Sequence, residues 1–178
     1  LYVMPKMSDF IKSNKAFNFL INSKNIVLEV IQENQNIDLT ENAYISSFLV
    51  PHRNEMSETV GYKIKSSLKS IIYLPDIDSW EKWDKNINDI IKNNDYSLID
   101  GTFYAKNEIL NRDIKNIPHP SISESLDKFS DLGVENRKKV FFTHLNHTNK
   151  ILKENNRETI SLLKKGYNIA SDGETFYI

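Results

Sequence analysis

The sequence has no cysteine, few glycines and prolines, and no long apolar run. Among its 178 residues there are five glycines and five prolines. The lack of cysteine excludes disulfides, cysteine-ligated zinc and a thiol nucleophile within this chain. No apolar stretch approaches the ~18 residues of a membrane span, and no segment resembles a secretory signal or a linker. We therefore expect a single cytoplasmic domain over residues 1–178.

An excess of charge of either sign is also missing. Lysine and arginine total 23 against 24 aspartate and glutamate, so the formal net charge is −1. This balance argues against a broad cationic face for nucleic acid, and we expect neither a nucleic-acid nor a membrane partner. Histidine is scarce as well, with only His52, His119, His144 and His147.

The pattern of apolar residues predicts alternating helices and strands, which is typical of a layered α/β fold. Asp78 with Glu81, and Ser121 with Glu124, have the spacing of helix capping pairs. We expect helices over 8–22, 80–92, 121–130 and 156–165, and strands over 25–31, 43–50, 60–64, 70–74, 96–99, 140–143, 167–169 and 175–178.

Three of the expected strands end in a side chain that can bind a metal ion, namely His52, Asp76 and His144. Ligands collect at strand ends in layered α/β folds. Two imidazoles and one carboxylate suit Zn²⁺, Mn²⁺ or Fe²⁺. Each residue taken alone is compatible with a capping or solvated polar group, but the three together predict a metal site. Asp78 is assigned to the cap of the helix that should begin near Trp80.

His119 lies between Pro118 and Pro120. Flanking prolines restrict the backbone, and a histidine held in this way suits a general acid. A loop histidine simply packed between prolines is the alternative.

Asp100 follows the expected strand 96–99 and precedes Gly101. It could orient a ligating histidine, or it could belong to an ordinary Asp-Gly turn. His147 and its neighbour Asn146 are predicted to contact the substrate or a ligating residue. Alternatively, His144 and His147 could bind one metal as an i,i+3 pair, or the segment could be a hydrogen-bonded turn.

In order, five segments resemble the metallo-β-lactamase-fold hydrolases, and within them the branch around pyrroloquinoline-quinone biosynthesis protein B (PqqB), which is related to tRNase Z. The family fold is an αββα sandwich, of which this chain would form mainly the C-terminal half. The family's HxHxDH motif does not occur in the sequence, and Leu1–Val3 reads like the end of a strand. We expect either an N-terminally truncated piece or a degenerate member. The segments are Val50–Ile64, Ile72–Trp83, Leu98–Tyr104, Ile117–Ser125 and Phe141–Asn149.

The resemblance implies that His52 and His144 each hold one of two divalent ions, that Asp76 bridges them, and that His119 protonates the leaving group. Zinc is the expected metal, with manganese or iron possible. Asp100 falls where tRNase Z-like members have a histidine–glutamate pair.

Three functions follow as hypotheses. The first is that the complete protein is a metal-dependent hydrolase that uses metal-activated water on a small ester-like or phosphodiester-like substrate, while this chain alone is inactive. The second is a non-haem iron oxidoreductase of the PqqB type in cofactor biosynthesis. The third is a non-catalytic half-domain with an exposed apolar face, which could form a homodimer.

Overall fold

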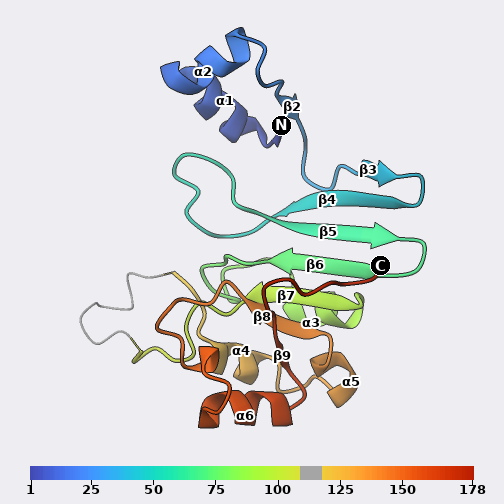
Figure 1. The fold of residues 1–178 in the computed structure, drawn as a ribbon, viewed down its shortest axis with the longest axis vertical. Coiled ribbons are helices and arrows are strands. Elements are labelled where there is room, and N and C mark those ends of the chain that lie inside the picture. The colour runs from blue at the N-terminus through green and yellow to red at the C-terminus, as the bar shows by residue number, and fades with distance from the viewer. Residues whose placement is uncertain (109–117) are drawn as a thin grey trace.

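The computed structural model describes residues 1–108 and 118–178, and it is a mixed α/β structure built on one large sheet (Figure 1). Seven strands lie in the order β3-β4-β5-β6-β7-β8-β9. Neighbours from β3 to β6 are antiparallel, and neighbours from β6 to β9 are parallel. The strands are β3 (Ile37–Thr40), β4 (Ala43–Leu49), β5 (Val60–Ser66), β6 (Ser70–Leu74), β7 (Tyr96–Asp100), β8 (Val140–Thr143) and β9 (Asn168–Ile169).

Helices cover one face of the parallel half of the sheet. Alternate residues of its central strands, among them Leu74, Ile99 and Phe142, are fully buried against apolar side chains of these helices. Because side chains alternate across a strand, this packing leaves the intervening residues on the opposite face. The elements on the covered side are α3 (Ile87–Lys92), α4 (Ile122–Lys128), α5 (Val134–Arg137), the 3-10 helix η2 (Lys150–Leu152) and α6 (Arg157–Lys164).

The opposite face of the sheet is also apolar. Cross-strand partners Tyr62 and Tyr73 lie there, with 36% and 41% of their surface exposed. The C-terminal segment runs back over this face (Figure 1). Its Phe176 packs against Tyr96 of β7 and Phe141 of β8, with ring centroids 5.2 and 5.0 Å apart. The segment therefore covers part of the face, and Tyr62 and Tyr73 remain open.

The N-terminal residues form two short helices and a two-stranded sheet at one end of the molecule (Figure 1). Instead of the single helix expected over 8–22, α1 (Pro5–Ser13) and α2 (Lys15–Asn22) meet at Asn14. The Asn14 side chain accepts hydrogen bonds from two amides of α2, so it ends one helix and caps the next. Instead of a strand over 25–31, only β2 (Glu29–Val30) forms, paired in parallel with β1 (Tyr2–Val3).

Glu58, in the loop between β4 and β5, holds this N-terminal unit. Its carboxylate accepts hydrogen bonds from the backbone amides of Lys6 (3.0 Å) and Met7 (3.3 Å) in the first turn of α1. A carboxylate at a helix N-terminus satisfies amides that have no partner within the helix. Burial raises the pKa of Glu58, but these hydrogen bonds and Lys6 outweigh it and leave the pKa below its usual range.

Two further predictions of secondary structure are wrong. The helix expected over 80–92 is confined to α3, because the indole of Trp80 donates to Ser125 Oγ and that of Trp83 donates to the Leu49 carbonyl, both at 3.0 Å. These tertiary contacts outweigh the helical periodicity. Residues 175–178 do not pair as a strand, because Phe176 packs across the sheet face instead.

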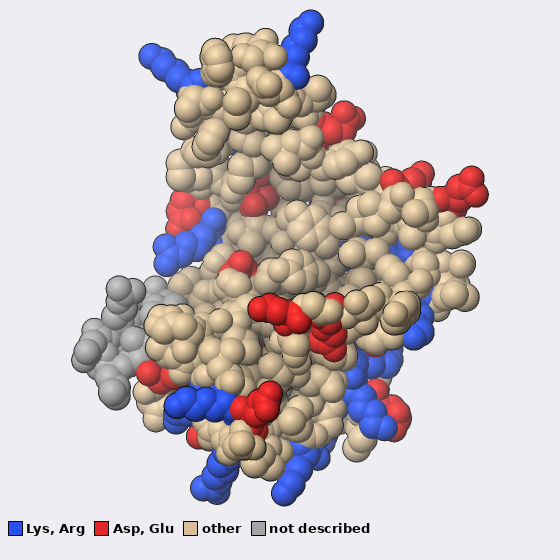
Figure 2. Space-filling model, viewed as in Figure 1, with Lys and Arg blue, Asp and Glu red and all other residues tan. Residues whose placement is uncertain are grey.

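Other elements agree closely with the prediction. The capping box of Ser121 and Glu124 is present at the start of α4. In the described ranges, no helix is long and apolar enough to cross a membrane. Acidic and basic side chains are interspersed over the face shown in Figure 2, without a large area of one sign.

Candidate metal centre

The candidate site lies where four strands end at one edge of the sheet. Strands β4, β6, β7 and β8 run in the same direction, since β4 and β6 are both antiparallel to β5 and the last three are parallel. Their carboxyl ends therefore meet at the same edge. His52, Asp76, Asp100 and His144 lie at or just beyond these ends. His119 reaches the same place from the loop that precedes α4.

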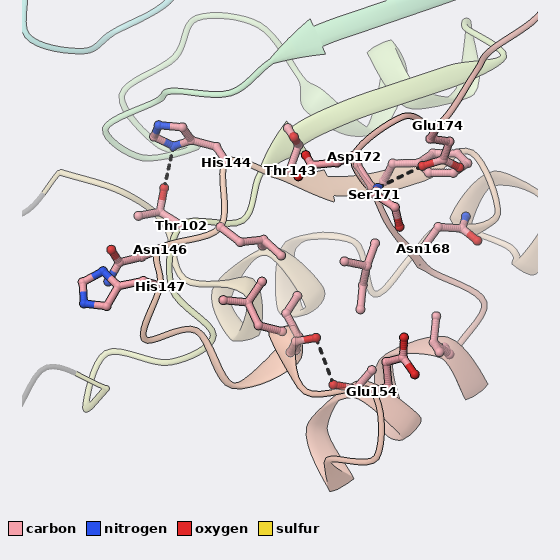
Figure 3. A pocket seen from close by; sticks show the side chains of 18 residues that line it. Thr102, Thr143, His144, Asn146, His147, Glu154, Asn168, Ser171, Asp172 and Glu174 are labelled. Carbon is pink, nitrogen blue, oxygen red and sulfur yellow. Dashed lines mark hydrogen bonds between the residues drawn. The ribbon is translucent and has the colours of Figure 1, made fainter.

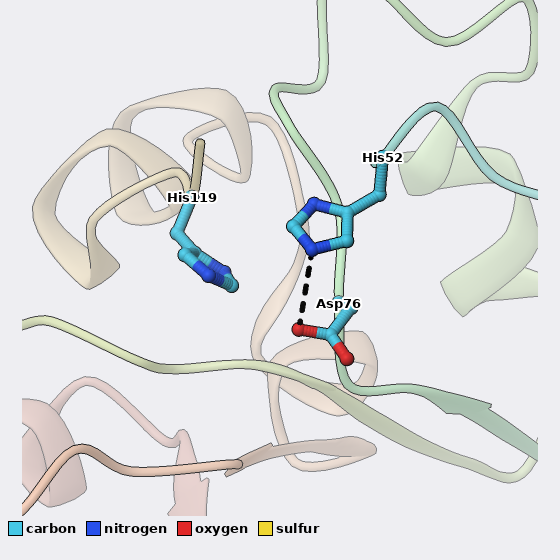
Figure 4. A group of neighbouring side chains, drawn as sticks. All are labelled: His52, Asp76 and His119. Carbon is cyan, nitrogen blue, oxygen red and sulfur yellow. Dashed lines mark ion pairs between the residues drawn. The ribbon is translucent and has the colours of Figure 1, made fainter. Parts of the chain in front are cut away.

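His52 lies between the carboxylates of Asp76 and Asp78, and Figure 4 shows it beside Asp76. Its Nε2 is 3.8 Å from Asp76 Oδ1, and its Nδ1 is 3.2 Å from Asp78 Oδ1. Asp78 also accepts a hydrogen bond from Lys82 Nζ at 2.9 Å. A carboxylate on Nδ1 favours the tautomer in which Nε2 carries the lone pair, as metal-bound histidines commonly require. Asp78 thus contacts a histidine and does not cap a helix, since no helix begins at Trp80.

His119 is paired with Asp100. Its Nδ1 is 2.7 Å from Asp100 Oδ2, and the side chain of Asp100 is fully buried. Burial lowers the pKa of His119, but the hydrogen bond to Asp100 and the charges of Asp100, Asp76 and Asp78 outweigh it, so the pKa is raised. The His119 ring centroid lies 5.2 Å from that of His52 and 5.8 Å from that of His144. The three imidazoles therefore surround one small space.

His144 has a left-handed backbone, with φ at +58°. A residue with a Cβ pays roughly 1–2 kcal/mol for this conformation, and such strain tends to occur at functional sites. The turn places His144 Nδ1 2.9 Å from Thr102 Oγ1 and 3.6 Å from Asp76 Oδ1. His144 is thus close to the predicted bridging carboxylate.

Gly101 and Asn149 bring the ends of β7 and β8 together. A Cβ on Gly101 would stand 2.9 Å from Phe142 Cβ and 3.0 Å from the Thr143 carbonyl, so only glycine fits without a shift. The buried Asn149 side chain donates to the carbonyls of Gly101 (2.7 Å) and Thr102 (3.2 Å). The Asp100-Gly101 pair therefore serves a close approach of two strands as well as a contact to histidine.

Among the described residues, two groups of side chains have ligand atoms close enough to hold a metal ion together, and both contain His119. One is His52, Asp76 and His119; the other is Asp100, His119 and His144. Both oxygens of Asp100 already accept hydrogen bonds, from Ile77 N, Thr102 N, Thr102 Oγ1 and His119. A cation there would have to displace these donors, so the group around Asp76 is the more available. Its imidazole nitrogens and carboxylate are a donor set that suits Zn²⁺, Mn²⁺ or Fe²⁺.

In the part of the chain that the structure describes, the side chains of His147 and Asn146 form no hydrogen bond with the site histidines, although Asn146 N donates to the Thr102 carbonyl at 3.0 Å. Both residues line a cavity of about 1090 Å³ beside the site (Figure 3). His144 lines the same cavity, whose far wall is formed by residues 168–174. Asn146 Nδ2 donates to Thr148 Oγ1 at 2.7 Å. A second hollow of about 540 Å³ reaches His52 and Pro118. Room for a small molecule therefore exists on two sides of the cluster.

The residues that the sequence singled out as ligands and acid come together, and two further participants were missed. Asp78 was assigned to a cap because its spacing to Glu81 is the same as that of a capping pair. Thr102 carries no signal of its own beyond following Asp-Gly at a strand end. Ile117, the first residue of the segment that contains His119, lies outside the described residues.

A sheet whose strand ends bring three imidazoles and a carboxylate together defines an α/β domain with a candidate metal centre. Residues 1–145 match the family model described as "Beta-lactamase superfamily domain", and the chain belongs to this family. The expected β-lactamase fold is thereby confirmed.

Among curated proteins, the chain is similar to Coenzyme PQQ synthesis protein B. The protein of Acinetobacter baumannii (strain ACICU) is 29% identical over 132 residues, which cover 69% of this chain and 43% of that protein. The protein of Methylobacillus flagellatus (strain ATCC 51484 / DSM 6875 / VKM B-1610 / KT) is 27% identical over 135 residues, covering 69% and 42%. The matched segment thus spans less than half the length of these relatives.

Solved structures share the fold. Zn²⁺-bound PqqB from Methylobacterium extorquens aligns with a TM-score of 0.78 at 22% identity, covering 100% of this chain and 62% of that one. A diphosphatase from the PhnP family aligns with a TM-score of 0.61 at 21% identity, covering 98% and 56%. An isothiocyanate hydrolase from Delia radicum gut bacteria aligns at 0.56 and 16% identity, covering 93% and 65%.

Proposed function

We propose that this chain is part of a metal-dependent hydrolase that acts on a small ester-like or phosphodiester-like substrate. The observation that carries the proposal is the convergence of His52, Asp76, His119 and His144 at one sheet edge, with Nδ1 of two of these histidines held by a carboxylate. The likeness to a diphosphatase and an isothiocyanate hydrolase concerns the fold and agrees with this class of reaction.

His52, Asp76 and His144 would hold the metal, because Asp76 Oδ1 lies 3.8 Å from a nitrogen of His52 and 3.6 Å from a nitrogen of His144. His119 is also close enough to His52 and Asp76 to serve as a ligand. We assign it to proton transfer instead, because Asp100 already binds its Nδ1. Zinc is the metal we propose, since nitrogen and oxygen donors suit it and the structure of similar fold is a zinc-bound one. Two divalent ions are proposed for the complete protein. When bound, such ions lower the pKa of a coordinated water and polarise the scissile group.

The chain's own residues would bind and protonate the substrate. His119 Nδ1 donates to Asp100, so Nε2 is the nitrogen that exchanges a proton with the leaving group. The hydrogen bond to Asp100 also holds the imidazole in one orientation, as proton transfer to a leaving group requires. The cavity beside His144, with Asn146 and His147 in its wall, would receive the small-molecule substrate.

The test compares Asp76→Ala with Asp9→Ala, a change of an exposed aspartate in α1. Hydrolysis of bis(p-nitrophenyl) phosphate is measured with added Zn²⁺ or Mn²⁺, on this chain and on the complete gene product that contains it. We expect Asp76→Ala to lower the rate of the complete product at least 100-fold and Asp9→Ala to leave it unchanged. Equal rates for the two variants, or no turnover with any divalent ion, would contradict the proposal.

A second candidate is an oxidoreductase with one non-haem iron in cofactor biosynthesis. The similarity to Coenzyme PQQ synthesis protein B favours it, and two histidines with one carboxylate also fit iron. Iron is loaded anaerobically and oxygen uptake is then recorded. Uptake that is absent with iron, alongside hydrolysis with zinc or manganese, would exclude this candidate.

A third candidate is a non-catalytic half-domain that associates through its open sheet face. The exposed tyrosines Tyr62 and Tyr73 favour it. Sedimentation of the 178-residue chain is expected to show a homodimer that Tyr73→Lys weakens. A monomer at all concentrations would count against association through this face.

A further inference from the structure

The hydroxyl of Thr102 lies among the side chains of the candidate site, and this residue is 7% exposed. Its Oγ1 lies 2.7 Å from Asp100 Oδ1, 2.9 Å from His144 Nδ1 and 3.2 Å from His119 Nδ1. It is therefore the atom through which His144 is connected to the buried carboxylate.

The number of hydrogens on each group decides which atom is the donor in the contacts of Thr102 with Asp100 and His144. A threonine hydroxyl has one hydrogen and can accept two further hydrogen bonds, whereas an ionised carboxylate only accepts. At 2.7 Å from Asp100 Oδ1, Thr102 must give its hydrogen to the carboxylate, since two oxygens without a hydrogen between them would repel each other. The Thr102 oxygen then has only lone pairs left for His144, so His144 Nδ1 must carry the hydrogen of their 2.9 Å contact.

The tautomer of His119 does not depend on Thr102. Its Nδ1 reaches Asp100 Oδ2 directly at 2.7 Å, and its 3.2 Å distance to Thr102 is the longer of the two. One buried carboxylate thus sets the tautomer of two histidines, His119 by direct contact and His144 through a single hydroxyl.

We propose that Thr102 is a positioning residue whose hydroxyl, held by Asp100, fixes His144 in the Nδ1–H tautomer and so leaves Nε2 as the nitrogen with a lone pair for a metal. The role in metal binding rests on the proposed function, whereas the tautomer does not. Partners of this kind are worth roughly 10- to 100-fold in metal affinity.

Thr102→Val removes the hydroxyl and keeps the shape, and Thr102→Ser keeps the hydroxyl. Thr143→Val is the matched control, a threonine at the end of the adjacent strand β8. Two-dimensional ¹H–¹⁵N spectra of the imidazoles, recorded without metal at a pH where they are neutral, report the tautomer of each histidine. His144→Gln and His119→Gln assign the signals.

We expect both His119 and His144 to be Nδ1–H in the wild-type chain, Thr102→Ser and Thr143→Val. In Thr102→Val we expect His144 to move toward the Nε2–H form and His119 to stay Nδ1–H. The unchanged His119 signal also shows that the variant is folded. If Thr102→Val does not fold, the wild-type spectrum still decides, because an Nε2–H form of His144 there overturns the proposal.

Zn²⁺ titration by calorimetry is the second measurement. Thr102→Val is expected to bind about 10-fold more weakly than wild type, with Thr102→Ser close to wild type. An unchanged His144 tautomer in Thr102→Val overturns the positioning role whatever the metal data show. If the tautomers behave as expected but the complete gene product binds no Zn²⁺, the proposed function fails and the hydrogen-bond assignment stands.

Discussion

Two histidine–carboxylate pairs in the candidate site differ in how deeply they are built into the fold. In the pair of His119 and Asp100, the atoms are 2.7 Å apart and the carboxylate is fully buried. In the pair of His52 and Asp78, they are 3.2 Å apart, and the carboxylate is 20% exposed and shared with Lys82. The first carboxylate is part of the core as well as of the site, whereas the second is partly exposed and orients a histidine that is nearly as buried as His119. Removing the Asp100 carboxylate should therefore lower the free energy of unfolding. Removing the Asp78 carboxylate should mainly affect the orientation of His52.

The largest expected effect is that of Asp100→Ala on the free energy of unfolding. Asp100 accepts from Ile77 N, Thr102 N, Thr102 Oγ1 and His119, and its loss leaves buried donors without a partner. We expect a loss of about 3 kcal/mol in urea denaturation. A loss below 1 kcal/mol would show that water replaces the carboxylate, and the comparison would then no longer hold.

Gly101→Ala should give the next largest effect, again at the buried pair. The new Cβ would meet Phe142 Cβ at 2.9 Å and the Thr143 carbonyl at 3.0 Å. We expect a loss of about 2 kcal/mol, because overpacking forces β7 and β8 apart. Gly133→Ala is the control, since its Cβ meets nothing within 4 Å. Similar losses in both variants would mean that the close approach of the strands is not responsible.

Asp78→Ala should change stability by less than about 1 kcal/mol, because its partner Lys82 is a largely exposed lysine. Metal affinity is the property that it should change. With His52 Nδ1 no longer held, we expect Zn²⁺ to bind about 10-fold more weakly in calorimetry. Lys82→Ala tests the lysine separately and should leave affinity close to wild type. If Asp78→Ala lost as much stability as Asp100→Ala, the two histidine–carboxylate pairs would not differ in their contribution to folding.

The smallest effect concerns Glu124, which caps α4 just after His119. Burial raises its pKa, but Lys106 and Ser121 outweigh it, so the folded-state pKa lies below the usual value of 4.5. A lowered pKa contributes stability above 4.5 that is lost as pH falls through the folded-state pKa. Thermal unfolding between pH 6 and 3 should therefore show a shallower acid decline in Glu124→Gln. Identical pH profiles of thermal unfolding for wild type and Glu124→Gln would exclude a contribution of Glu124 to the acid decline.

The sequence was sufficient wherever local chemistry decides structure. Apolar runs with β-branched residues define β6 and β8 at the predicted bounds, and Ser121 with Glu124 opens α4 as expected. The strand ends also predicted that His52, Asp76 and His144 would lie near one another. The helix expected over 80–92 formed only as α3, because the indoles of Trp80 and Trp83 donate to groups distant in the sequence.

The remaining site contacts depend on the same long-range geometry. Asp78 has the spacing of a cap, and nothing local shows that His52 will lie 3.2 Å away. Thr102 contacts His144 only because Gly101 and Asn149 bring two strand ends together. Such contacts follow from the arrangement of strands, which short-range patterns do not contain.

The contact between Glu58 and α1 has a consequence for the site. The loop that follows β4 has His52 near its start and Glu58 near its end, and Glu58 binds the first turn of the N-terminal helix. Only residues 53–57 separate His52 from the Glu58 carboxylate that binds α1. His52 and the docking contact of α1 therefore belong to one loop, and neither His52 nor Glu58 is part of the hydrophobic core.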